Sequence, residues 1–582
     1  MKKITRSDKN IFMKILLIYP YCLENRIHEE DAGVVPIGLY YIGALLRDNN
    51  YDVEILNFQG LNKNNDKIKE ILISRNPDVI GFSILNANRW GGIEIAGMAK
   101  QINPDVKNIF GGVSAAFLWK HFLEHFPEID YIVTGEGEYT FLNLIRIFEK
   151  KDNKSIKEIR GIAYRDNKII VKTKPAEPIQ NIDLLPNPAK YFTYQHISLT
   201  RGCPGNCTFC GSPGFWGRKV RFHSCDYFVE QIEMLYKKGI SFFYISDDTF
   251  TLKKNLVIEI CKKIIEKNLN ISWAAISRVD CINDEILSWM RKAGCSQISY
   301  GVESGSEKNR KFFNKNITID QVKNAFSLTQ KYGILARAYF IYGCPGENDD
   351  TINETIDLIK EIKPLSTIFY ILDIFPGTAL YEDFRKRFNI NDDIWLNRIE
   401  DILWFEYDPD LSKEKILAFG KKLRTSFYKS LPGFADSIEL IDNKELYPLH
   451  ADFFSKLAMT FSHGDYSQVE DIPGKEKTAE NLCKKALQYA PDHRAFLNLG
   501  MIYQKQGDFA KSIEILSKGL DFFPKSEELH LCIGISYMNL GQFKKALSYF
   551  LDFKDSKQMA FYIEHCYKKI YGKNHSHLKL LP

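Results

Sequence analysis

Three things are scarce in this 582-residue sequence: long apolar runs, an excess of one charge, and closely spaced cysteines. No run of about 18 apolar residues occurs, so a membrane-spanning helix is not expected. Lys and Arg number 78 against 73 Asp and Glu and are spread along the chain, which argues against nucleic acid as the main partner. Twelve cysteines in so long a chain are too sparse for a secreted disulfide scaffold. We therefore expect a reducing cytoplasm, where clustered thiols indicate a metal site.

The N-terminal segment also lacks the marks of a secretory signal peptide. Its apolar run at 15–19 is short, and no cleavage site with small residues follows it. We interpret this run as the first strand of an α/β domain, with Met13 as an alternative start of the chain.

Alternating strands and helices are expected in the first part of the sequence, residues 1–188. Short apolar runs suited to buried strands are separated by segments with helical periodicity. This alternation predicts a doubly wound, Rossmann-like parallel sheet, which binds ligands at the carboxyl ends of its strands. The expected strands are 14–19, 52–58, 78–85, 106–112 and 129–138.

The middle of the chain, residues 189–385, repeats this alternation with six expected strands. Eight units would be needed to close a TIM barrel, so we predict a partial (β/α)6 barrel. Residues 386–445 are expected to form a helical connecting region with breaks at Pro409 and Pro432. The expected barrel strands are 196–202, 242–248, 272–278, 297–303, 336–343 and 368–375.

Residues 446–582 contain an internal repeat. Gly500 and Gly534 lie 34 positions apart, and so do Tyr503 and Tyr537. This period, with Gly–x–Phe between two helices, is the tetratricopeptide pattern. Each such unit is a helical hairpin that buries its apolar face by stacking on a neighbour. We predict α-helical repeats that either hold a protein or peptide partner or cap the barrel.

The stretch SLTRGCPGNCTFCGSP, residues 198–213, contains the most informative motif. Cys203, Cys207 and Cys210 are separated by three and then two residues, on a loop rich in glycine and proline after an expected strand. Thiolates are the ligands that iron–sulfur clusters use, and glycines let a loop approach an inorganic core closely. Three thiolates leave one iron of a 4Fe–4S cluster open. We predict that these cysteines bind the metal cluster and are required for catalysis.

A zinc site is the alternative for the same cysteines. Structural zinc takes four protein ligands, and the nearest candidates to complete the set are His223 and Cys225. The spacing of the cysteines, their place after a strand and the six-unit barrel favour the iron–sulfur cluster.

With this motif the chain resembles the radical S-adenosylmethionine (SAM) superfamily. That superfamily usually has an aromatic residue before the third cysteine, here Phe209. The resemblance implies that the amino and carboxylate groups of SAM chelate the open iron. An electron from the reduced cluster would then break the sulfonium bond and yield a 5′-deoxyadenosyl radical. An electron donor such as flavodoxin or ferredoxin is implied as a partner.

The resemblance also implies SAM contacts at the carboxyl ends of the barrel strands. The second strand ends at Asp247 and Asp248, where members of the superfamily bind the SAM amino group. Asp248 is the first candidate and Asp247 the second, with a helix N-cap as the alternative. Arg278 would meet the SAM carboxylate as a bidentate donor, or else form a surface ion pair. The residues expected near the ribose and the adenine are Glu303, Ser304 and Gly343.

Further motifs narrow the resemblance to radical SAM enzymes with a cobalamin-binding domain. They are PIGLYYIGALL at 36–46, the glycine pair at 111–112, GEGEYTF at 135–141 and FPGTALY at 375–381. The Asp–x–His–x–x–Gly pattern that supplies a lower axial histidine is missing. Similar proteins without it either hold cobalamin without a histidine or bind none. The strand-end positions expected to line a corrin crevice, or else to be turn glycines and caps, are Ser83, Asn86, Gly111, Gly112, Ser114, Gly135 and Glu136.

The resemblance implies an enzyme, most simply a cobalamin-dependent methyltransferase that acts on an unactivated carbon. Radical cyclisation, rearrangement or C–C coupling without methyl transfer is the second hypothesis. A scaffold or peptide-binding role centred on the repeats is the third, which the intact cysteine triad disfavours. Small-molecule, lipid and peptide substrates all occur among similar enzymes.

Overall fold

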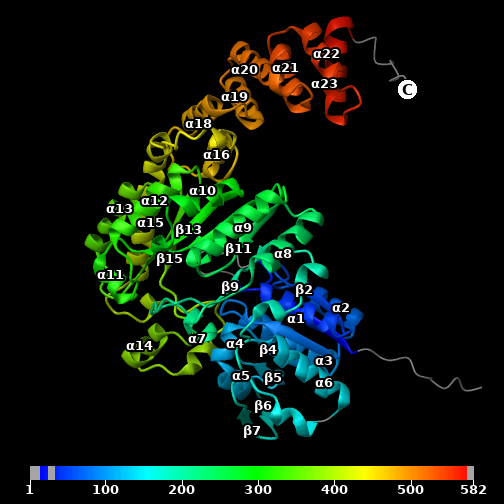
Figure 1. The fold of residues 1–582 in the computed structure, drawn as a ribbon, viewed down its shortest axis with the longest axis vertical. Coiled ribbons are helices and arrows are strands. Elements are labelled where there is room, and N and C mark those ends of the chain that lie inside the picture. Colours follow the sequence, from blue (N-terminus) through cyan, green and yellow to red (C-terminus); the bar gives the residue numbers. More distant parts are fainter. Residues whose placement is uncertain (1–12, 24–32, 152, 573–582) are drawn as a thin grey trace, which may run out of the picture.

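A computed structural model describes residues 13–23, 33–151 and 153–572, which form three connected parts (Figure 1). The first part contains a seven-stranded sheet in the order β2-β1-β3-β4-β5-β6-β7, in which β1 to β5 are parallel. The parallel strands are β1 (Lys14–Tyr19), β2 (Asp52–Asn57), β3 (Val79–Ser83), β4 (Lys107–Gly111) and β5 (Tyr131–Val133). The helices that accompany them are α1 (Ile37–Asp48), α2 (Asn65–Arg75), α3 (Arg89–Ile102), α4 (Val113–Phe117), α5 (Trp119–His125) and α6 (Glu138–Lys150).

Both faces of this sheet are covered. Along β1, Leu16 and Ile18 belong to one hydrophobic core, whereas Ile15 and Leu17 belong to another. Successive side chains of a strand point to opposite faces, so the continuous apolar run is the consequence of burial on both sides. The expected doubly wound parallel sheet is confirmed.

A hairpin extends the far edge of the sheet and was not expected from the sequence. Strands β6 (Ile162–Asp166) and β7 (Ile169–Lys172) are antiparallel to each other, and β6 is antiparallel to β5. Asn167, in the turn between them, has a positive φ of 56°. Asn tolerates this left-handed conformation, which a tight turn requires.

The second part is an open sheet of six parallel strands in the order β15-β14-β13-β12-β11-β8. This arrangement confirms the partial barrel. Its strands are β8 (His196–Ile197), β11 (Phe242–Ile245), β12 (Ser272–Ser277), β13 (Cys295–Glu303), β14 (Leu335–Tyr342) and β15 (Ser366–Ile371). Its helices are α7 (Ser212–Trp216), α8 (Cys225–Lys237), α9 (Lys254–Glu266), α10 (Asp284–Lys292), α11 (Glu307–Phe312), α12 (Ile319–Lys331), α13 (Asp349–Ile362) and α14 (Ala379–Phe388).

The expected strand at 196–202 is broken into two pieces. Only His196–Ile197 joins the barrel sheet, as β8, whereas β9 (Thr200–Arg201) pairs with β10 (Arg221–Phe222) in a separate antiparallel ribbon. The backbone N–H groups of Leu199 and Thr200 donate to the carboxylate of Asp247 and not to a neighbouring strand. The barrel strand β8 therefore ends at Ile197, before the cysteine motif.

The connecting region contains one long helix, α15 (Lys413–Asp436). Pro409 lies in the turn before this helix, as expected for a break. Pro432 does not end the helix, because the last turn continues beyond it to Asp436. The expectation of a break at Pro432 was therefore wrong.

The third part is a run of stacked helices (Figure 1). Gly500 packs against Leu516 and Gly534 against Phe550, so closely that a Cβ atom would come within 2.4 Å and 2.2 Å of these side chains. The repeated glycines thus allow paired helices to approach each other. The helices are α16 (Tyr447–Ser462), α17 (Asp465–Gln468), α18 (Lys475–Tyr489), α19 (His493–Lys505), α20 (Phe509–Phe522), α21 (Glu527–Asn539), α22 (Phe543–Leu551) and α23 (Lys557–Tyr571).

Helix α16 joins the repeats to the barrel at the amino ends of its strands. Phe453 and Lys456 of α16 line a surface pocket together with Phe242, Ser296 and Leu335, which lie at or near the starts of β11, β13 and β14. The Arg291 guanidinium of α10 also donates to the backbone carbonyl of Leu449 in α16. The repeats therefore attach at the opposite end of the barrel from the carboxyl ends of its strands.

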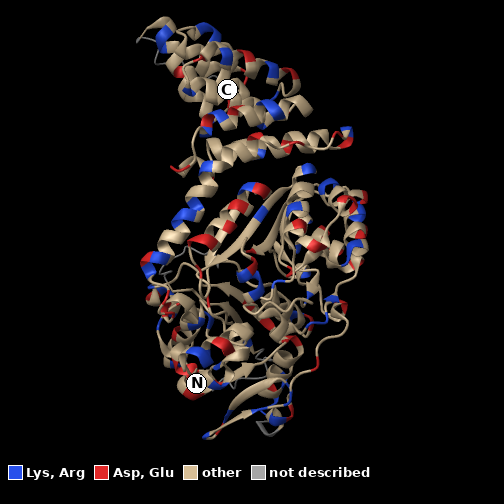
Figure 2. Cartoon of the chain, turned by 90° about the vertical axis from the view of Figure 1, so that its left-hand side faces the viewer, with Lys and Arg blue, Asp and Glu red and all other residues tan. Residues whose placement is uncertain are grey.

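Charged residues of both signs are mixed along all three parts (Figure 2). Among the helices in the described ranges, none has the combination of length and apolar character that a bilayer crossing requires.

Candidate cluster and cofactor site

The three motif cysteines lie on the loop between β9 and α7, which backbone contacts hold in place. The Thr208 N–H donates to the carbonyl of Phe313 at 3.0 Å, and the Thr208 hydroxyl donates to the carbonyl of Phe312 at 3.1 Å. The Thr208 carbonyl in turn accepts from the N–H of Leu380 at 2.8 Å. The centre of the loop is thus attached to the end of α11 and to the start of α14.

The three motif thiols lie near enough to affect one another. Cys203 acts electrostatically on Cys207, and both act on Cys210. Burial raises the pKa of the Cys210 thiol to about 11 and raises that of Cys207 as well. Thiols with raised pKa values must lose their protons when a metal binds, so assembly of a cluster here releases protons.

One of the two residues that could complete a zinc site with the motif cysteines is already hydrogen-bonded to other residues. His223 is not free to be a fourth ligand, because its Nδ1 bonds to Asp183 at 2.7 Å and its Nε2 to Tyr41 at 2.9 Å.

A buried ion pair borders the cysteine loop and was not recognised in the sequence. Glu303 ends β13 with a positive φ of 67°, and its Oε1 accepts from the Nζ of Lys315 at 2.9 Å. The Lys315 charge acts on Cys207, as does that of Arg278. Arg278 bonds in a bidentate manner to Asp280, at 2.9 and 2.8 Å. Lys315 and Arg278 therefore lie near Cys207, each paired with a carboxylate.

The two neighbouring aspartates at the end of β11 have different surroundings. Asp247 is 2% exposed, and its carboxylate accepts from Leu199 N–H, Thr200 N–H and Ser198 Oγ. Asp248 lines the cleft described below and accepts from Ser212 Oγ. Asp247 is thus occupied in shaping the cysteine loop, and Asp248 remains the candidate for contact with SAM.

Ser304, Phe209 and Gly343 are further residues expected to contact SAM. The Ser304 hydroxyl contacts that of Thr355 at 3.2 Å and accepts from the Ser306 N–H at 3.1 Å. Phe209 packs edge-on against Phe313, with ring centroids 5.2 Å apart. Gly343 has a φ of +88°, which favours glycine. Their roles toward SAM stay predictions.

Glu347 supports the Gly343 turn and provides a test of this region. Its buried carboxylate accepts from the N–H groups of Gly343 and Cys344 and from the amide of Asn309. Burial raises the pKa of Glu347 to about 7, although these donors oppose the shift. A raised folded-state pKa stabilises the protein below the unfolded value near 4.5, and that stability is lost as the pH rises through about 7.

We therefore expect Glu347→Gln to flatten the pH dependence of unfolding. The wild type should lose roughly 3 kcal/mol relative to this variant across that pH window. Urea unfolding midpoints measured at both ends of the window check the result. Glu354→Gln, on the exposed face of α13, makes the same change in charge and should follow the wild type. An unchanged pH slope in Glu347→Gln would contradict the assignment.

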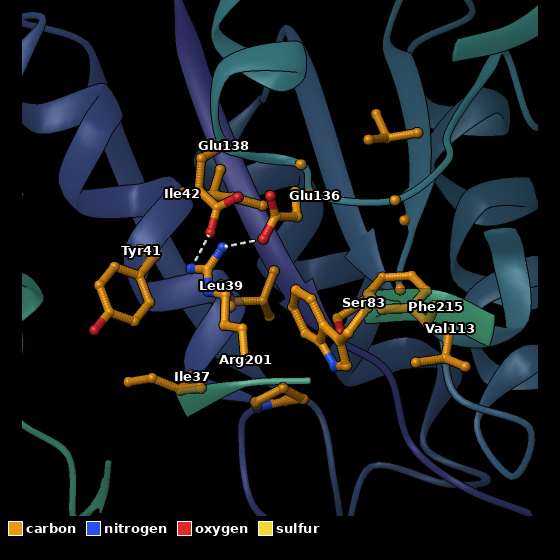
Figure 3. A pocket seen from close by; sticks show the side chains of 18 of the residues that line it. Ile37, Leu39, Tyr41, Ile42, Ser83, Val113, Glu136, Glu138, Arg201 and Phe215 are labelled. Atoms are coloured by element: carbon orange, nitrogen blue, oxygen red, sulfur yellow. Dashed lines mark hydrogen bonds and ion pairs between the residues drawn. The ribbon is translucent and has the colours of Figure 1, made fainter. Parts of the chain in front are cut away.

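A cleft joins the first part of the chain to the barrel, and Figure 3 shows part of its lining. The carboxyl ends of β3, β4 and β5 form one side, and the segments around β9 and the end of β11 form the other. The lining residues from the first part include Ser83, Gly111, Gly112, Val113, Gly135 and Glu136. Those from the barrel include Ser198, Thr200, Arg201, Gly202, Ser246 and Asp248.

A buried ionic network crosses this cleft. Arg201 bonds to Glu136 at 3.1 Å and to Glu138 at 2.5 Å (Figure 3). Arg221 bonds to the same Glu136 at 2.7 Å. All four side chains are 8% exposed or less. Glu136 was expected in the cleft, but its link through Arg201 to the cysteine motif was not.

The first domain leaves space in the cleft for a large ligand. A Cβ atom on Gly135 would meet no atom within 4 Å, and one on Gly111 none closer than 3.9 Å, so these strand ends leave space. Gly112 instead fits the alternative of a turn glycine, since its φ is +93° and a Cβ would contact the Ile84 carbonyl at 2.7 Å.

Two of the seven predicted crevice residues do not line the cleft. Asn86 and Ser114 are buried, and the side-chain amide of Asn86 and the hydroxyl of Ser114 have no hydrogen-bond partner. Buried polar atoms without partners are costly, so a polar ligand that reached them would stabilise the fold. The open strand ends at Gly111 and Gly135 leave room for a corrin, whereas contacts of Asn86 and Ser114 with its amide side chains stay predictions.

Sequence patterns of known families match all three parts. The radical SAM superfamily matches residues 197–359, the B12 binding domain matches residues 32–145, and the tetratricopeptide repeat matches residues 493–526.

Two relatives each match about two thirds of this chain. An uncharacterized methyltransferase of Pyrococcus horikoshii is 32% identical over 382 residues, which are 64% of this chain and 83% of that protein. The anaerobic magnesium-protoporphyrin IX monomethyl ester cyclase of Rubrivivax gelatinosus is 28% identical over 404 residues, which are 65% of this chain and 71% of that protein.

A solved structure has a similar fold. The radical SAM methyltransferase TsrM from Kitasatospora setae, with cobalamin and a 4Fe–4S cluster bound, superposes with a TM-score of 0.57. The match covers 82% of this chain and 99% of that chain, at 15% identity.

Proposed function

This chain belongs to the radical SAM superfamily and carries a B12-binding domain before the barrel, and from that premise we propose that it methylates an unactivated carbon with cobalamin as methyl carrier. The observation that carries the proposal is the shared cleft. Gly111 and Gly135 open into it from the first domain, and Asp248 lines it from the barrel, next to the cysteine loop. A corrin and SAM would thus bind on facing walls.

The residues of this chain have separate tasks in the proposal. Cys203, Cys207 and Cys210 hold the cluster, and Asp248 binds the SAM amino group. Arg278 would meet the SAM carboxylate by giving up its bonds to Asp280. When bound, the cluster and SAM supply radical chemistry, and the corrin supplies the methyl group. The apolar and ionic walls of the cleft exclude water and fix the distance between the two cofactors.

Radical cyclisation without methyl transfer is the second candidate. The 28% identity to the anaerobic cyclase of Rubrivivax gelatinosus favours it, because that match covers 65% of this chain. The two candidates differ in one product: methyl transfer leaves an added carbon on the substrate, and cyclisation does not.

The test starts from the protein reconstituted anaerobically with iron and sulfide and then given SAM, a reductant and a corrin. We expect release of deoxyadenosine and about one corrin per chain by absorption spectroscopy. Gly111→Leu should fill the cleft and lower corrin affinity at least ~10-fold, since a well-packed site does not admit four extra carbons without strain. Its cluster content should stay at the wild-type level.

Gly97→Leu is the matched control, because Gly97 lies on α3 with no atom near its Cβ position. It should bind corrin like the wild type. Deoxyadenosine release with no corrin bound would refute methyl transfer and leave the cyclase candidate. Equal corrin binding by Gly111→Leu and wild type would show that the corrin lies elsewhere.

Partners and location follow from the same proposal. Twelve cysteines in so long a chain and an oxygen-sensitive cluster suit a reducing compartment, and we place the protein in the cytoplasm. A flavodoxin or ferredoxin would supply the electron.

The tetratricopeptide repeat is compatible with a protein partner, and we propose that the stacked helices hold a protein or peptide. The substrate is a small molecule, lipid or peptide that enters the cleft.

A further inference from the structure

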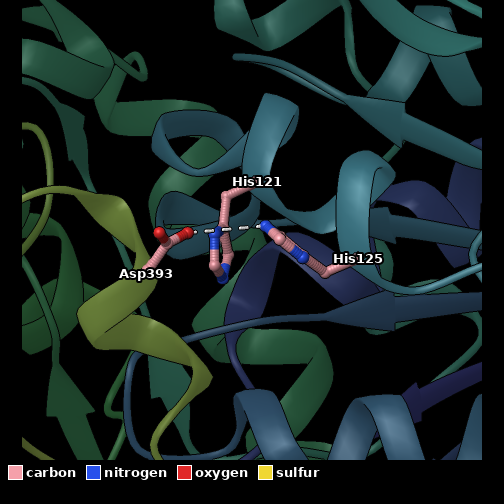
Figure 4. Close-up of side chains that lie close together, drawn as sticks. All are labelled: His121, His125 and Asp393. Atoms are coloured by element: carbon pink, nitrogen blue, oxygen red, sulfur yellow. Dashed lines mark ion pairs between the residues drawn. The ribbon is translucent and has the colours of Figure 1, made fainter.

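Three potential metal ligands meet where the first domain contacts the segment after the barrel (Figure 4). His121 and His125 lie one turn apart on α5, and Asp393 comes from the short helix η6 (Asp392–Leu396). One ligand atom from each residue lies within 4.8 Å of the other two. His125 Nε2 and Asp393 Oδ1 are 3.7 Å apart.

His121 is available as a neutral ligand. Its side chain is buried, with 4% of the residue exposed, and its Nε2 has no hydrogen-bond partner. Burial, with a smaller contribution from His125, lowers the pKa of His121 to about 4. The imidazole is therefore uncharged at neutral pH, which is the form that binds metal ions.

The Asp393 carboxylate is held in place by its own neighbour. Asn391 donates from Nδ2 to Asp393 Oδ2 at 3.0 Å and accepts the Asp393 N–H at 3.0 Å. With Oδ2 fixed in this way, Oδ1 faces His125. Such support of a ligating side chain is typical of metal sites, because it orients the ligand before the metal arrives.

We propose that His121, His125 and Asp393 form a binding site for a divalent transition metal ion such as zinc, separate from the cysteine cluster. Two imidazoles and a carboxylate are a ligand set that zinc uses, with water in the fourth position. Tetrahedral ligands at ~2.0–2.1 Å from zinc lie about 3.4 Å apart, so the 3.7 Å between His125 and Asp393 closes with a small movement of side chains.

The location gives the ion a structural role. The same segment already contacts the first domain, because the Arg89 and Trp90 side chains donate to the Asn397 carbonyl and Glu94 pairs with Arg398 at 2.8 Å. An ion held by α5 and η6 adds a further link between the first domain and the segment that follows the barrel. It thereby restrains the walls of the cofactor cleft.

Zinc titration of the full-length protein, with its cluster reconstituted so that the motif thiolates are occupied, tests the proposal. Competition with a chromophoric chelator should give one zinc per chain. His125→Ala and Asp393→Asn should each lower zinc affinity at least ~10-fold. Mutation of residues that only hydrogen-bond to a metal ligand already causes a loss of that size. Both residues are exposed, so neither change should prevent folding.

Glu124→Gln is the matched control, since Glu124 lies on the same helix and pairs with Lys120. It should bind zinc like the wild type. Thermal unfolding with and without zinc provides a second readout: the wild type and the control should gain stability, and the two ligand variants should not. Wild-type zinc affinity in both ligand variants, or no zinc bound by the wild type, would overturn the assignment.

Discussion

Cys207→Ala should remove the cluster and reduce SAM cleavage to background. Two thiolates would remain for a cluster that three hold, and the loop around them is fixed through Thr208 to α11 and α14, so no other cysteine can replace the missing one. Iron content, the paramagnetic resonance signal of the reduced cluster and release of deoxyadenosine should all disappear together. This is the largest effect that we expect from any single change in the chain.

Cys532→Ala is the matched control for this experiment. Cys532 is also a free, partly buried cysteine, but it lies in the repeats. Its loss should leave iron content and deoxyadenosine release unchanged. Deoxyadenosine formed by Cys207→Ala at the wild-type rate would disprove the cluster assignment, and with it the proposed reaction.

Arg201→Leu should destabilise the protein by about 3–5 kcal/mol, the usual effect of removing one partner from a buried ion pair. The change leaves Glu138 buried without a cation and Glu136 with Arg221 alone. One oxygen of Glu138 already lacks a hydrogen-bond partner. Loss of Arg201 would leave the other oxygen without its cation as well. Denaturant unfolding followed by tryptophan fluorescence measures the loss, since Trp216 lies against Arg201.

The control is an ion pair of similar composition on the surface. Arg160 and Glu177 are 2.6 Å apart, but their side chains are 50% and 76% exposed. Arg160→Leu should therefore cost less than about 1 kcal/mol. A cost for Arg201→Leu as small as that would mean that water reaches the network, and that the cleft wall is not sealed as we describe.

The sequence was sufficient for the layers of the fold and for the cysteine loop, because both depend on local patterns. A continuous apolar run such as 14–19 indicates burial on both faces, and three cysteines on one short loop must lie near one another. The pair of Lys315 with Glu303 and that of Arg201 with Glu138 had no such local signal. Each joins elements that only the folded chain brings together.

The contacts of the two aspartates depend on the folded chain. The sequence favoured Asp248 over Asp247 for contact with SAM; in the structure Asp247 bonds to the backbone at 199–200, and Asp248 lines the cleft. The end of the expected strand 242–248 was misplaced, because β11 ends at Ile245.

The site of attachment of the repeats has a consequence for how the protein works. Helix α16 sits at the amino ends of the barrel strands, and the cysteine loop sits at their carboxyl ends. The partner that we propose for the stacked helices would thus bind at the end of the barrel remote from the cysteine loop. Its binding would leave the cofactor cleft uncovered.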